Sequence, residues 1–448
     1  MTQEPINKGE RTASMTKNHM LQPCRFPRIV VLTLLGTSVL ACDTKVTNPG
    51  RYEDKFLDLP AAHTAVVNGS SRLLSDGLNE VAYTTAAITR ELFPGGSTSS
   101  FGITPRQQTG ILAFDDEHVS WTSNQRARFV AEQAYERFKA ERGQAGEPFE
   151  SYEPGARAAL WAGYANRILG ENWCQVIFDG GSPVPGDSAL KRAEYWFTQA
   201  LSIAEAGSIA EVKNAALAGR ASVRAGLGNW SGALADAAQV PTSFKFQMKY
   251  AAAATDQYNA IFWAGNSTPY RAHTVWRTMY DEYYTQTKDP RVKWGLHPTQ
   301  SQGDAAVLDL GKVPFHQQQK YTDRASPINL SSGREMRLIE VEGLLRGGNY
   351  TDAISRINEL RTSVGAPVIA AASLDEAWTL FKRERGIELW LEGRRMGDFR
   401  RWQKTDTPGA LSELEIPGAA SRLSEQRSLC YEIPKDERET NPNARSGG

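Results

Sequence analysis

The sequence lacks the short motifs that place catalytic groups in several common enzyme classes. No H-E-x-x-H, G-x-S-x-G, G-x-x-x-x-G-K or C-x-x-C occurs in its 448 residues. Such motifs supply metal ligands, nucleophiles, phosphate-binding backbone or redox thiols. The six histidines also show no metal-ligand spacing. We therefore predict no catalytic residue, no metal and no cofactor, and a protein that is not an enzyme.

An excess of charge of one sign is also missing. The chain has 51 basic residues (Lys and Arg) and 51 acidic residues (Asp and Glu). Proteins that bind nucleic acid draw much of their affinity from a surplus of basic residues that neutralises phosphates. We therefore expect no nucleic-acid partner.

Long apolar runs are absent beyond the N-terminal region. There, residues 29–40 are mostly apolar, Arg25 and Arg28 precede them, and no acidic residue occurs from 11 to 41. Polar residues and a glycine interrupt the run, and it falls well short of the roughly 20 apolar residues that a membrane-spanning helix needs. The layout predicts a cleavable secretory signal.

The residues that end this run, Val39-Leu40-Ala41-Cys42, resemble the lipobox of bacterial lipoproteins. A cysteine thiolate is nucleophilic enough to take up a diacylglyceryl group, and a small residue before it suits the signal peptidase. The resemblance implies that residues 1–41 are removed as a signal peptide and that Cys42 is lipidated. Residues 42–60 then form a tether to the membrane, held by two or three acyl chains because one chain binds only marginally.

Cysteine is scarce, with four in the chain. Cys24 lies in the predicted signal and Cys42 is the predicted lipidation site, which leaves Cys174 and Cys430. In an oxidising compartment these two can form a disulfide, which would stabilise the fold by on the order of 5 kcal/mol in the chain-entropy model. The alternative is two buried thiols that pack as small apolar groups.

Helical periodicity dominates the rest of the sequence and divides it into three regions. Residues 61–240 form an N-terminal helical region and residues 333–448 a C-terminal one. Between them, residues 241–332 are rich in loops and should face the ligand. Residues 244–248 alternate in polarity like a short strand. The fold class predicted is mainly α, with a few short strands in the middle region.

Individual helices are predicted from the spacing of apolar residues. The first is expected to break near Gly69 or Gly77. The predicted ranges are 61–92, 124–142, 154–169, 188–206, 209–227, 231–239, 334–345, 351–363 and 373–402.

Two predicted turns between helices repeat each other. Residues 228–234 and 348–354 both read Gly-Asn-aromatic, followed by Ala-aliphatic at the same offset. Glycine ends one helix in a left-handed cap, the aromatic packs back on the hairpin, and the alanine lets the second helix approach closely. The turns resemble those of tetratricopeptide repeats, but no 34-residue period continues along the chain. We therefore expect divergent hairpins within a larger helical domain.

The C-terminal third carries the sharpest resemblance to a known family. It follows the pattern ER-x-x-EL-x-x-EG-x-R-x-x-DLRRW of the SusD/RagB lipoproteins. The matching residues are Arg383-Glu384-Arg385-Gly386-Ile387-Glu388-Leu389, Glu392-Gly393-Arg394-Arg395 and Asp398-Phe399-Arg400-Arg401-Trp402. Shorter pieces similar to the family are Asn48-Pro49, Asp289-Pro290-Arg291, Tyr431-Glu432-Ile433-Pro434 and Asn441-Pro442-Asn443. Their order and spacing span nearly the whole mature chain.

This resemblance implies a SusD-like α/α superhelix with tetratricopeptide-like hairpins. It further implies a lipoprotein of the outer membrane, exposed at the cell surface, that captures glycan fragments or peptides. The implied partner is a SusC-like, TonB-dependent barrel transporter. Two alternatives stay open: a surface glycoside hydrolase, for which residues 115–117 would supply paired acids, and a helical-repeat scaffold that binds proteins.

We expect the charged residues of the family motif to be structural. Met396, Phe399 and Trp402 make an apolar stripe at three-residue spacing that must face a core. The charges of residues 383–402 would lie three or four residues apart on one helix, where each exposed pair contributes a few tenths of a kcal/mol. The motif therefore predicts a clasp between helices rather than a ligand site.

The ligand site should contain aromatic side chains that do not belong to the helical core. A rigid indole stacks on the C–H face of a sugar while polar neighbours bind its hydroxyls. Four tryptophans lie in or near irregular segments: Trp121, Trp263, Trp276 and Trp294.

The family resemblance places the ligand surface in the loop after the first helices and in the middle of the chain. We therefore expect Trp121 with Asp115 and Asp116, and Trp263 with Tyr270, to bind the ligand. The competing explanation for each of these aromatics is ordinary core packing.

Overall fold

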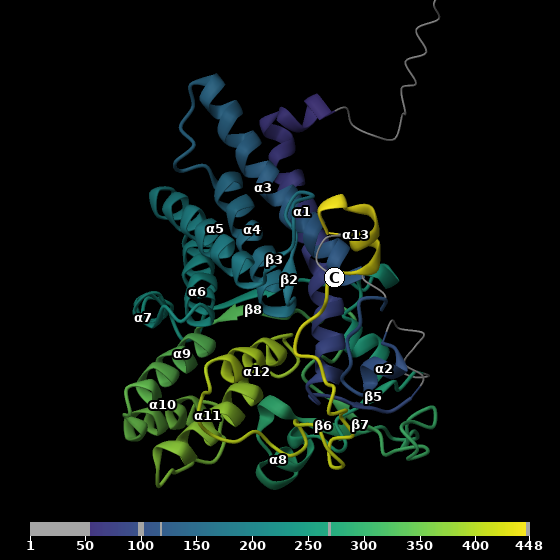
Figure 1. Cartoon of the computed structure of the whole chain (residues 1–448). Coiled ribbons are helices and arrows are strands. Elements are labelled where there is room, and N and C mark those ends of the chain that lie inside the picture. The colour runs from purple at the N-terminus through teal and green to yellow at the C-terminus, as the bar shows by residue number, and fades with distance from the viewer. Residues whose placement is uncertain (1–53, 97–102, 117–118, 268–269, 445–448) are drawn as a thin grey trace, which may run out of the picture. The chain divides into compact units, whose positions relative to one another are not determined.

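The computed structural model describes residues 54–96, 103–116, 119–267 and 270–444 (Figure 1). They all belong to one compact unit, Tyr52–Gly448. The predicted signal 1–41 and Cys42 lie outside the described residues, as do most of the predicted tether and Glu117. No described helix is long and apolar enough to cross a bilayer.

The described fold is mainly α, as predicted. Its α-helices are α1 (Pro60–Ile88), α2 (Pro105–Gln108), α3 (Val119–Ala145), α4 (Glu153–Asn172), α5 (Asp187–Ala206), α6 (Ala210–Gly226), α7 (Trp230–Ala237), α8 (Met279–Thr287), α9 (Gly333–Arg346), α10 (Tyr350–Thr362), α11 (Leu374–Glu388), α12 (Arg395–Lys404) and α13 (Lys435–Thr440). Shorter helical turns are η1 (Asp54–Asp58), η3 (Thr255–Gln257), η4 (Ile261–Asn266), η5 (Pro290–Val292) and η6 (Pro442–Ala444).

Within the described ranges, the short strands form four two-stranded sheets, and all four are antiparallel. The pairs are β1 (Phe93–Pro94) with β5 (His273–Thr274), β2 (Gln175–Val176) with β3 (Val184–Pro185), β4 (Lys245–Met248) with β8 (Ile328–Ser332), and β6 (Trp294–Leu296) with β7 (His316–Gln318). The strand predicted at 244–248 is confirmed as β4. Its partner β8 joins the two ends of the middle region.

Helices α3 to α7 pack in chain order, each against the next, and α1 packs along α3 and α4 (Figure 1). Small residues allow this close approach. The ring of Phe197 on α5 fills the space over Gly163 of α4 and Gly219 of α6, where a Cβ atom would collide with it. Glycine at these two crossings therefore lets the helices pack closely, and it does not break them.

The predicted break near Gly69 or Gly77 is wrong, because α1 continues without interruption from Pro60 to Ile88. A Cβ atom on Gly77 would lie 2.5 Å from the side chain of Asn124 on α3. Glycine costs a helix only about 1 kcal/mol, and the contact between α1 and α3 outweighs that cost.

The two repeated turns form helix hairpins, as predicted. Gly228 and Gly348 adopt left-handed conformations, with φ of +81° and +78°. The side chain of Asn229 accepts a hydrogen bond from a backbone N–H in the first turn of α7, and Asn349 does the same for α10. Such caps satisfy backbone donors that the helix leaves unpaired. Helix α7 packs on α9, so the two hairpins contact each other.

The middle region contains a helix, α8, that the sequence did not predict. Thr278 caps it by accepting a hydrogen bond from Asp281 N at 3.3 Å. Its buried positions are Met279, Tyr280 and Tyr283. Tyrosines occupy most of its inner face, so the apolar periodicity is weak.

The single helix predicted over 373–402 is also wrong, because α11 ends at Glu388 and α12 begins at Arg395. The turn between them contains Leu391 and Gly393 with φ of +61° and +69°. Glu91, just beyond α1, accepts a hydrogen bond from Leu391 N at 2.7 Å. The turn is therefore shaped by a residue 300 positions away in the chain.

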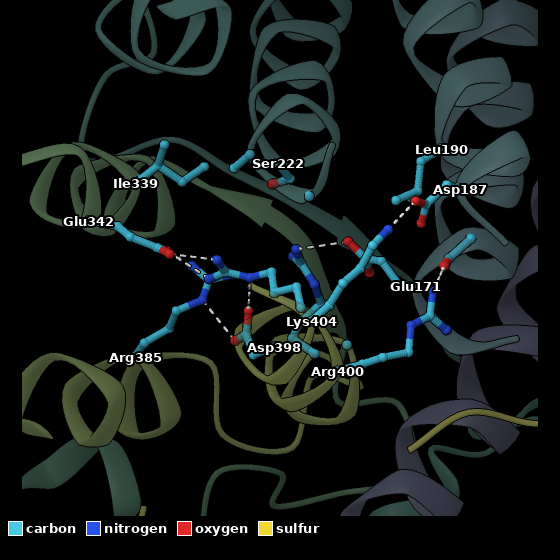
Figure 2. Close-up of a pocket in the computed structure, with 16 residues that line it drawn as sticks. Glu171, Asp187, Leu190, Ser222, Ile339, Glu342, Arg385, Asp398, Arg400 and Lys404 are labelled. Carbon is cyan, nitrogen blue, oxygen red and sulfur yellow. Dashed lines mark hydrogen bonds and ion pairs between the residues drawn. The ribbon is translucent and has the colours of Figure 1, made fainter. Parts of the chain in front are cut away.

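The charges of the family motif form buried pairs across the fold rather than exposed pairs along one helix, so that expectation is corrected. Asp398 lies 2.7 Å from Arg385 and 3.0 Å from Arg401, and Arg401 reaches Glu342 of α9 at 2.6 Å (Figure 2). The pocket among these residues holds about 50 Å³, room for one or two water molecules. The motif is therefore a clasp, as proposed from its apolar stripe.

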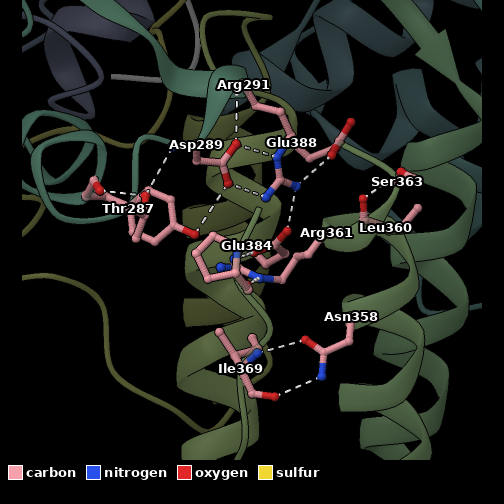
Figure 3. A network of polar contacts seen from close by, with 12 residues as sticks. Thr287, Asp289, Arg291, Asn358, Leu360, Arg361, Ser363, Ile369, Glu384 and Glu388 are labelled. Carbon is pink, nitrogen blue, oxygen red and sulfur yellow. Dashed lines mark hydrogen bonds and ion pairs between the residues drawn. The ribbon is translucent and has the colours of Figure 1, made fainter. Parts of the chain in front are cut away.

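A second network ties the middle region to the C-terminal helices (Figure 3). The guanidinium of Arg291 lies 2.6 Å from Asp289, 2.5 Å from Glu384 and 2.9 Å from Glu388. Arg361 of α10 reaches the other oxygen of Glu384 at 2.7 Å. Three segments of the chain thus meet at one buried carboxylate.

We predict that Asp398→Asn lowers the free energy of unfolding by about 3–5 kcal/mol, because it leaves two buried guanidiniums short of a carboxylate. Urea unfolding at neutral pH measures the loss. The matched control is Asp187→Asn, which removes an exposed pair with Lys404 and should cost at most about 1 kcal/mol. Equal losses in the two variants would contradict the role of Asp398.

The pH dependence of this loss follows from the pKa of Asp398. Burial alone would raise it, but Arg385 and Arg401 outweigh burial and lower the pKa to about 2. An unfolded chain has a value of about 3.9, so ionised Asp398 stabilises the fold fully above about pH 4, and this contribution is lost as the pH falls through about 2. The difference between wild type and Asp398→Asn should shrink over that interval.

Candidate functional site

Two of the predicted ligand-binding residues, Trp263 and Tyr270, come together in the middle region. Their ring centroids lie 5.1 Å apart at an interplanar angle of 69°. The ring centroid of Tyr258 lies 5.1 Å from that of Trp263, at an interplanar angle of 67°. The guanidinium of Arg324 lies 4.8 Å from the ring centroids of both Tyr258 and Trp263. We call these four side chains the aromatic platform.

Buried Asn259 holds the two segments of the platform together. Its backbone N–H donates to the carbonyl of Arg324 at 2.8 Å. Its side chain accepts from Phe262 N at 3.1 Å and donates to the carbonyl of Ser326 at 2.9 Å. Trp263 itself lies in η4, a π-helical turn, a rare conformation that often occurs at functional sites.

The platform combines buried and accessible surfaces. Tyr258 is 8% exposed, Trp263 and Tyr270 are half-buried, and Arg324 is exposed. Nη1 of Arg324 donates to the hydroxyl of Tyr258 at 3.4 Å, which leaves most of its N–H donors available. Aromatic faces beside fixed donors can bind a ring with hydroxyl groups. Neither a nucleophile nor a pair of carboxylates belongs to the platform.

Trp121 does not join this surface. Its side chain is 4% exposed, its ring lies 5.8 Å from that of Trp173, and its Nε1 faces Glu437 at 3.5 Å. The prediction that Trp121 offers a ligand surface is therefore corrected, and core packing is its role in this structure. Trp276 and Trp294 are half-buried, in contact with Phe93 and His316.

Asp115 and Asp116 are brought together by one guanidinium. Arg106 lies 2.8 Å from Asp115 and 2.7 Å from Asp116, and Asp116 also accepts from Ala113 N at 2.8 Å. The hydrogen bond from Arg106 lowers the pKa of Asp115, whereas a glycosidase needs one acid with a raised pKa. The arrangement is that of a structural ion pair.

The sequence missed two members of the platform, Tyr258 and Arg324. Tyr258 lies five positions before Trp263 and was within reach of a search for neighbouring aromatics. Arg324 carries no sequence signal, because only the pairing of its backbone with Asn259 places it there. Among the residues that the structure describes, no cluster of His, Cys, Asp and Glu suits a metal ion.

Residues 334–443, which contain the buried clasp, match the SusD family. This C-terminal part of the chain is therefore similar to the SusD/RagB family. No curated relative matches the sequence.

Solved structures extend the likeness to the whole fold. A SusD superfamily protein from Bacteroides fragilis is 12% identical with a TM-score of 0.61, over 86% of this chain and 99% of that one. A SusD superfamily protein from Bacteroides vulgatus is 11% identical with a TM-score of 0.59, over 86% and 97%. A SusD-like carbohydrate binding protein from the same species is 14% identical with a TM-score of 0.57, over 86% and 97%. The predicted SusD-like helical superhelix is thereby confirmed.

Cys174 and Cys430 form a disulfide bond, with Cα atoms 5.2 Å apart. The bond joins the end of α4 to the C-terminal segment. Beside it, Cys174 N donates to the carbonyl of Tyr431 at 2.9 Å, and the ring of Tyr431 stacks on Trp173 at 4.9 Å. Of the two alternatives left open by the sequence, the structure has the disulfide.

We predict that Trp121→Ala lowers the free energy of unfolding by about 3–5 kcal/mol, because it opens a cavity in the core. Trp263→Ala should cost clearly less, because that side chain is already half in solvent. Urea denaturation of the two variants gives both values. A larger loss for Trp263→Ala would contradict the placement of these two tryptophans.

Proposed function

We propose that this protein is a cell-surface binding protein that captures oligosaccharides at the aromatic platform and delivers them to a SusC-like, TonB-dependent transporter of the outer membrane. The platform is the observation that carries the proposal, because it combines aromatic faces with polar donors on an accessible surface. The family supports it, and so does the similarity to a protein described as carbohydrate binding.

The platform suits sugars for a physical reason. The backbone segments that carry Trp263 and Arg324 are tied together at Asn259 before the ligand arrives, and the guanidinium of Arg324 already stacks on Trp263. Binding then costs little side-chain entropy. A sugar ring can pack its C–H groups against Tyr270 or Trp263 while the guanidinium of Arg324 donates to its oxygens. Peptides are the alternative ligand class.

We further propose export and lipid anchoring, with residues 1–41 removed and Cys42 acylated. The disulfide between Cys174 and Cys430 supports export, because such bonds persist mainly in oxidising compartments. Helix α1 begins at Pro60, so a tether of fewer than 20 residues would separate the anchor from the helical body. Such a tether raises the effective concentration of the protein at the transporter.

Binding without catalysis is favoured over the two alternatives. The acid pair that a glycoside hydrolase would use, Asp115 and Asp116, is engaged by Arg106. A free-standing repeat scaffold is disfavoured because the two hairpins are built into the body of the fold. Release of new reducing ends from a polysaccharide by the purified protein would instead support the hydrolase.

We expect Trp263→Ala and Tyr270→Ala each to weaken oligosaccharide binding at least about tenfold, the effect typical of aromatic side chains at the centre of a binding surface. Isothermal titration calorimetry against a panel of oligosaccharides and peptides measures this and separates the two ligand classes. Tyr195→Ala is the control, since Tyr195 is a 51% exposed aromatic on α5. Unchanged affinity in both platform variants would contradict the proposal that the platform binds the ligand.

We expect Cys42→Ala to retain ligand binding in solution and to fail to support uptake by cells. The substitution leaves the platform intact but removes the predicted anchor. Titration of the purified variant and growth of cells on the bound glycan as carbon source test the two parts. Normal growth of cells that carry only Cys42→Ala would contradict anchoring at this residue.

A further inference from the structure

Arg324 differs from the arginines of the two buried networks in what its guanidinium contacts. Arg291, Arg395 and Arg401 each lie within 3 Å of a carboxylate. Among the described residues, no acidic side chain pairs with Arg324, whose guanidinium rests against the rings of Tyr258 and Trp263. Such stacking orients the plane of the guanidinium, and Nη1 donates to the hydroxyl of Tyr258 at 3.4 Å. The side chain as a whole is exposed, so a ligand can approach its other N–H groups.

Two acidic residues that neighbour platform residues in the sequence have other partners. Asp323 accepts a hydrogen bond from Ala325 N at 2.7 Å, within its own turn. Asp256, close to Tyr258 in the sequence, pairs with Arg72 at 3.0 Å. Arg324 therefore presents a positive charge at the platform.

A fixed guanidinium beside aromatic rings is the arrangement that selects a carboxylate. Its two parallel N–H groups match the two oxygens of that planar anion. A neutral sugar needs only hydroxyl contacts, which any polar side chain can supply. On the basis of the proposed function, we infer that the ligand is an acidic glycan, and that Arg324 binds the carboxylate of a uronate residue whose ring packs on Trp263 or Tyr270.

The test uses the soluble mature chain and calorimetry with three probes of equal length: an oligogalacturonate, a neutral β-galacto-oligosaccharide and a sulfated galacto-oligosaccharide that has no carboxylate. The wild type should bind the oligogalacturonate most tightly. Arg324→Gln should weaken that binding roughly 10- to 100-fold, as expected for loss of a charge-assisted hydrogen-bond pair, and should change the neutral probe less than about twofold.

Two further variants separate local from general effects of charge. Arg126→Gln removes the same charge from an exposed position on α3 and should leave binding of the oligogalacturonate unchanged. Arg324→Lys keeps the charge but not the planar fork, so its affinity should fall between those of wild type and Arg324→Gln. Added salt should weaken binding more in wild type than in Arg324→Gln.

Results that contradict the inference can be told apart from results that contradict the proposed function. Preference for the neutral probe, or an equal loss for both probes in Arg324→Gln, overturns the inference while the proposed function stands. Tighter binding of the sulfated probe overturns the assignment to a carboxylate. If none of the three probes binds and Trp263→Ala changes no affinity for any oligosaccharide, the proposed function fails and the inference fails with it.

Discussion

Buried carboxylates hold distant segments of this chain together, and each of them pairs with side chains from two or more segments. Glu392 is the member of this group that acts on the platform. One of its oxygens accepts from Lys320 Nζ and from Asn329 Nδ2, both at 2.7 Å. Arg324 lies between those two residues in the sequence, so the segment that carries it is pinned at both ends to the turn after α11. The family motif, far from the platform in sequence, thus fixes part of the proposed binding surface.

Such carboxylates define the fold because burying a charged group costs a large amount of free energy. A charge removed from water is tolerated only when every partner is in place. A buried carboxylate also joins helices in the N-terminal half, where Glu132 accepts hydrogen bonds from Arg128, Asn166 and Trp196 at 2.8–3.0 Å. A slip of α3, α4 or α5 by one turn would separate Glu132 from its partners. These contacts therefore select one arrangement of helices whose apolar faces, rich in alanine, are poorly distinguished from each other.

The difference between local contacts and contacts made across the fold explains which features could be predicted from the sequence. Helix ends at the repeated turns follow local rules, and the left-handed glycine caps predicted there appear at Gly228 and Gly348. The break between α11 and α12 follows no local rule, because Glu91 and Lys320 shape that turn from far along the chain. Likewise Trp263 and Tyr270 could be paired by proximity in the sequence, whereas the burial of Trp121 depends on Trp173 and on the C-terminal segment.

The C-terminal segment makes the helical layer and the clasp mutually dependent. The disulfide at Cys174 holds this segment against the end of α4. At the same helix end, Arg400 of α12 donates to the carbonyls of Gly170 and Trp173 at 2.6 and 2.9 Å, where the unpaired carbonyls of a helix attract a cation. Arg400 therefore fixes α12 relative to α4, and the disulfide fixes the C-terminal segment to the same helix end. Glu392 fixes the segment that carries Arg324 relative to the turn that precedes α12. A ligand that binds at the platform as proposed would meet backbone segments whose positions were set by folding, and its affinity would depend on the few groups it touches rather than on rearrangement of the protein.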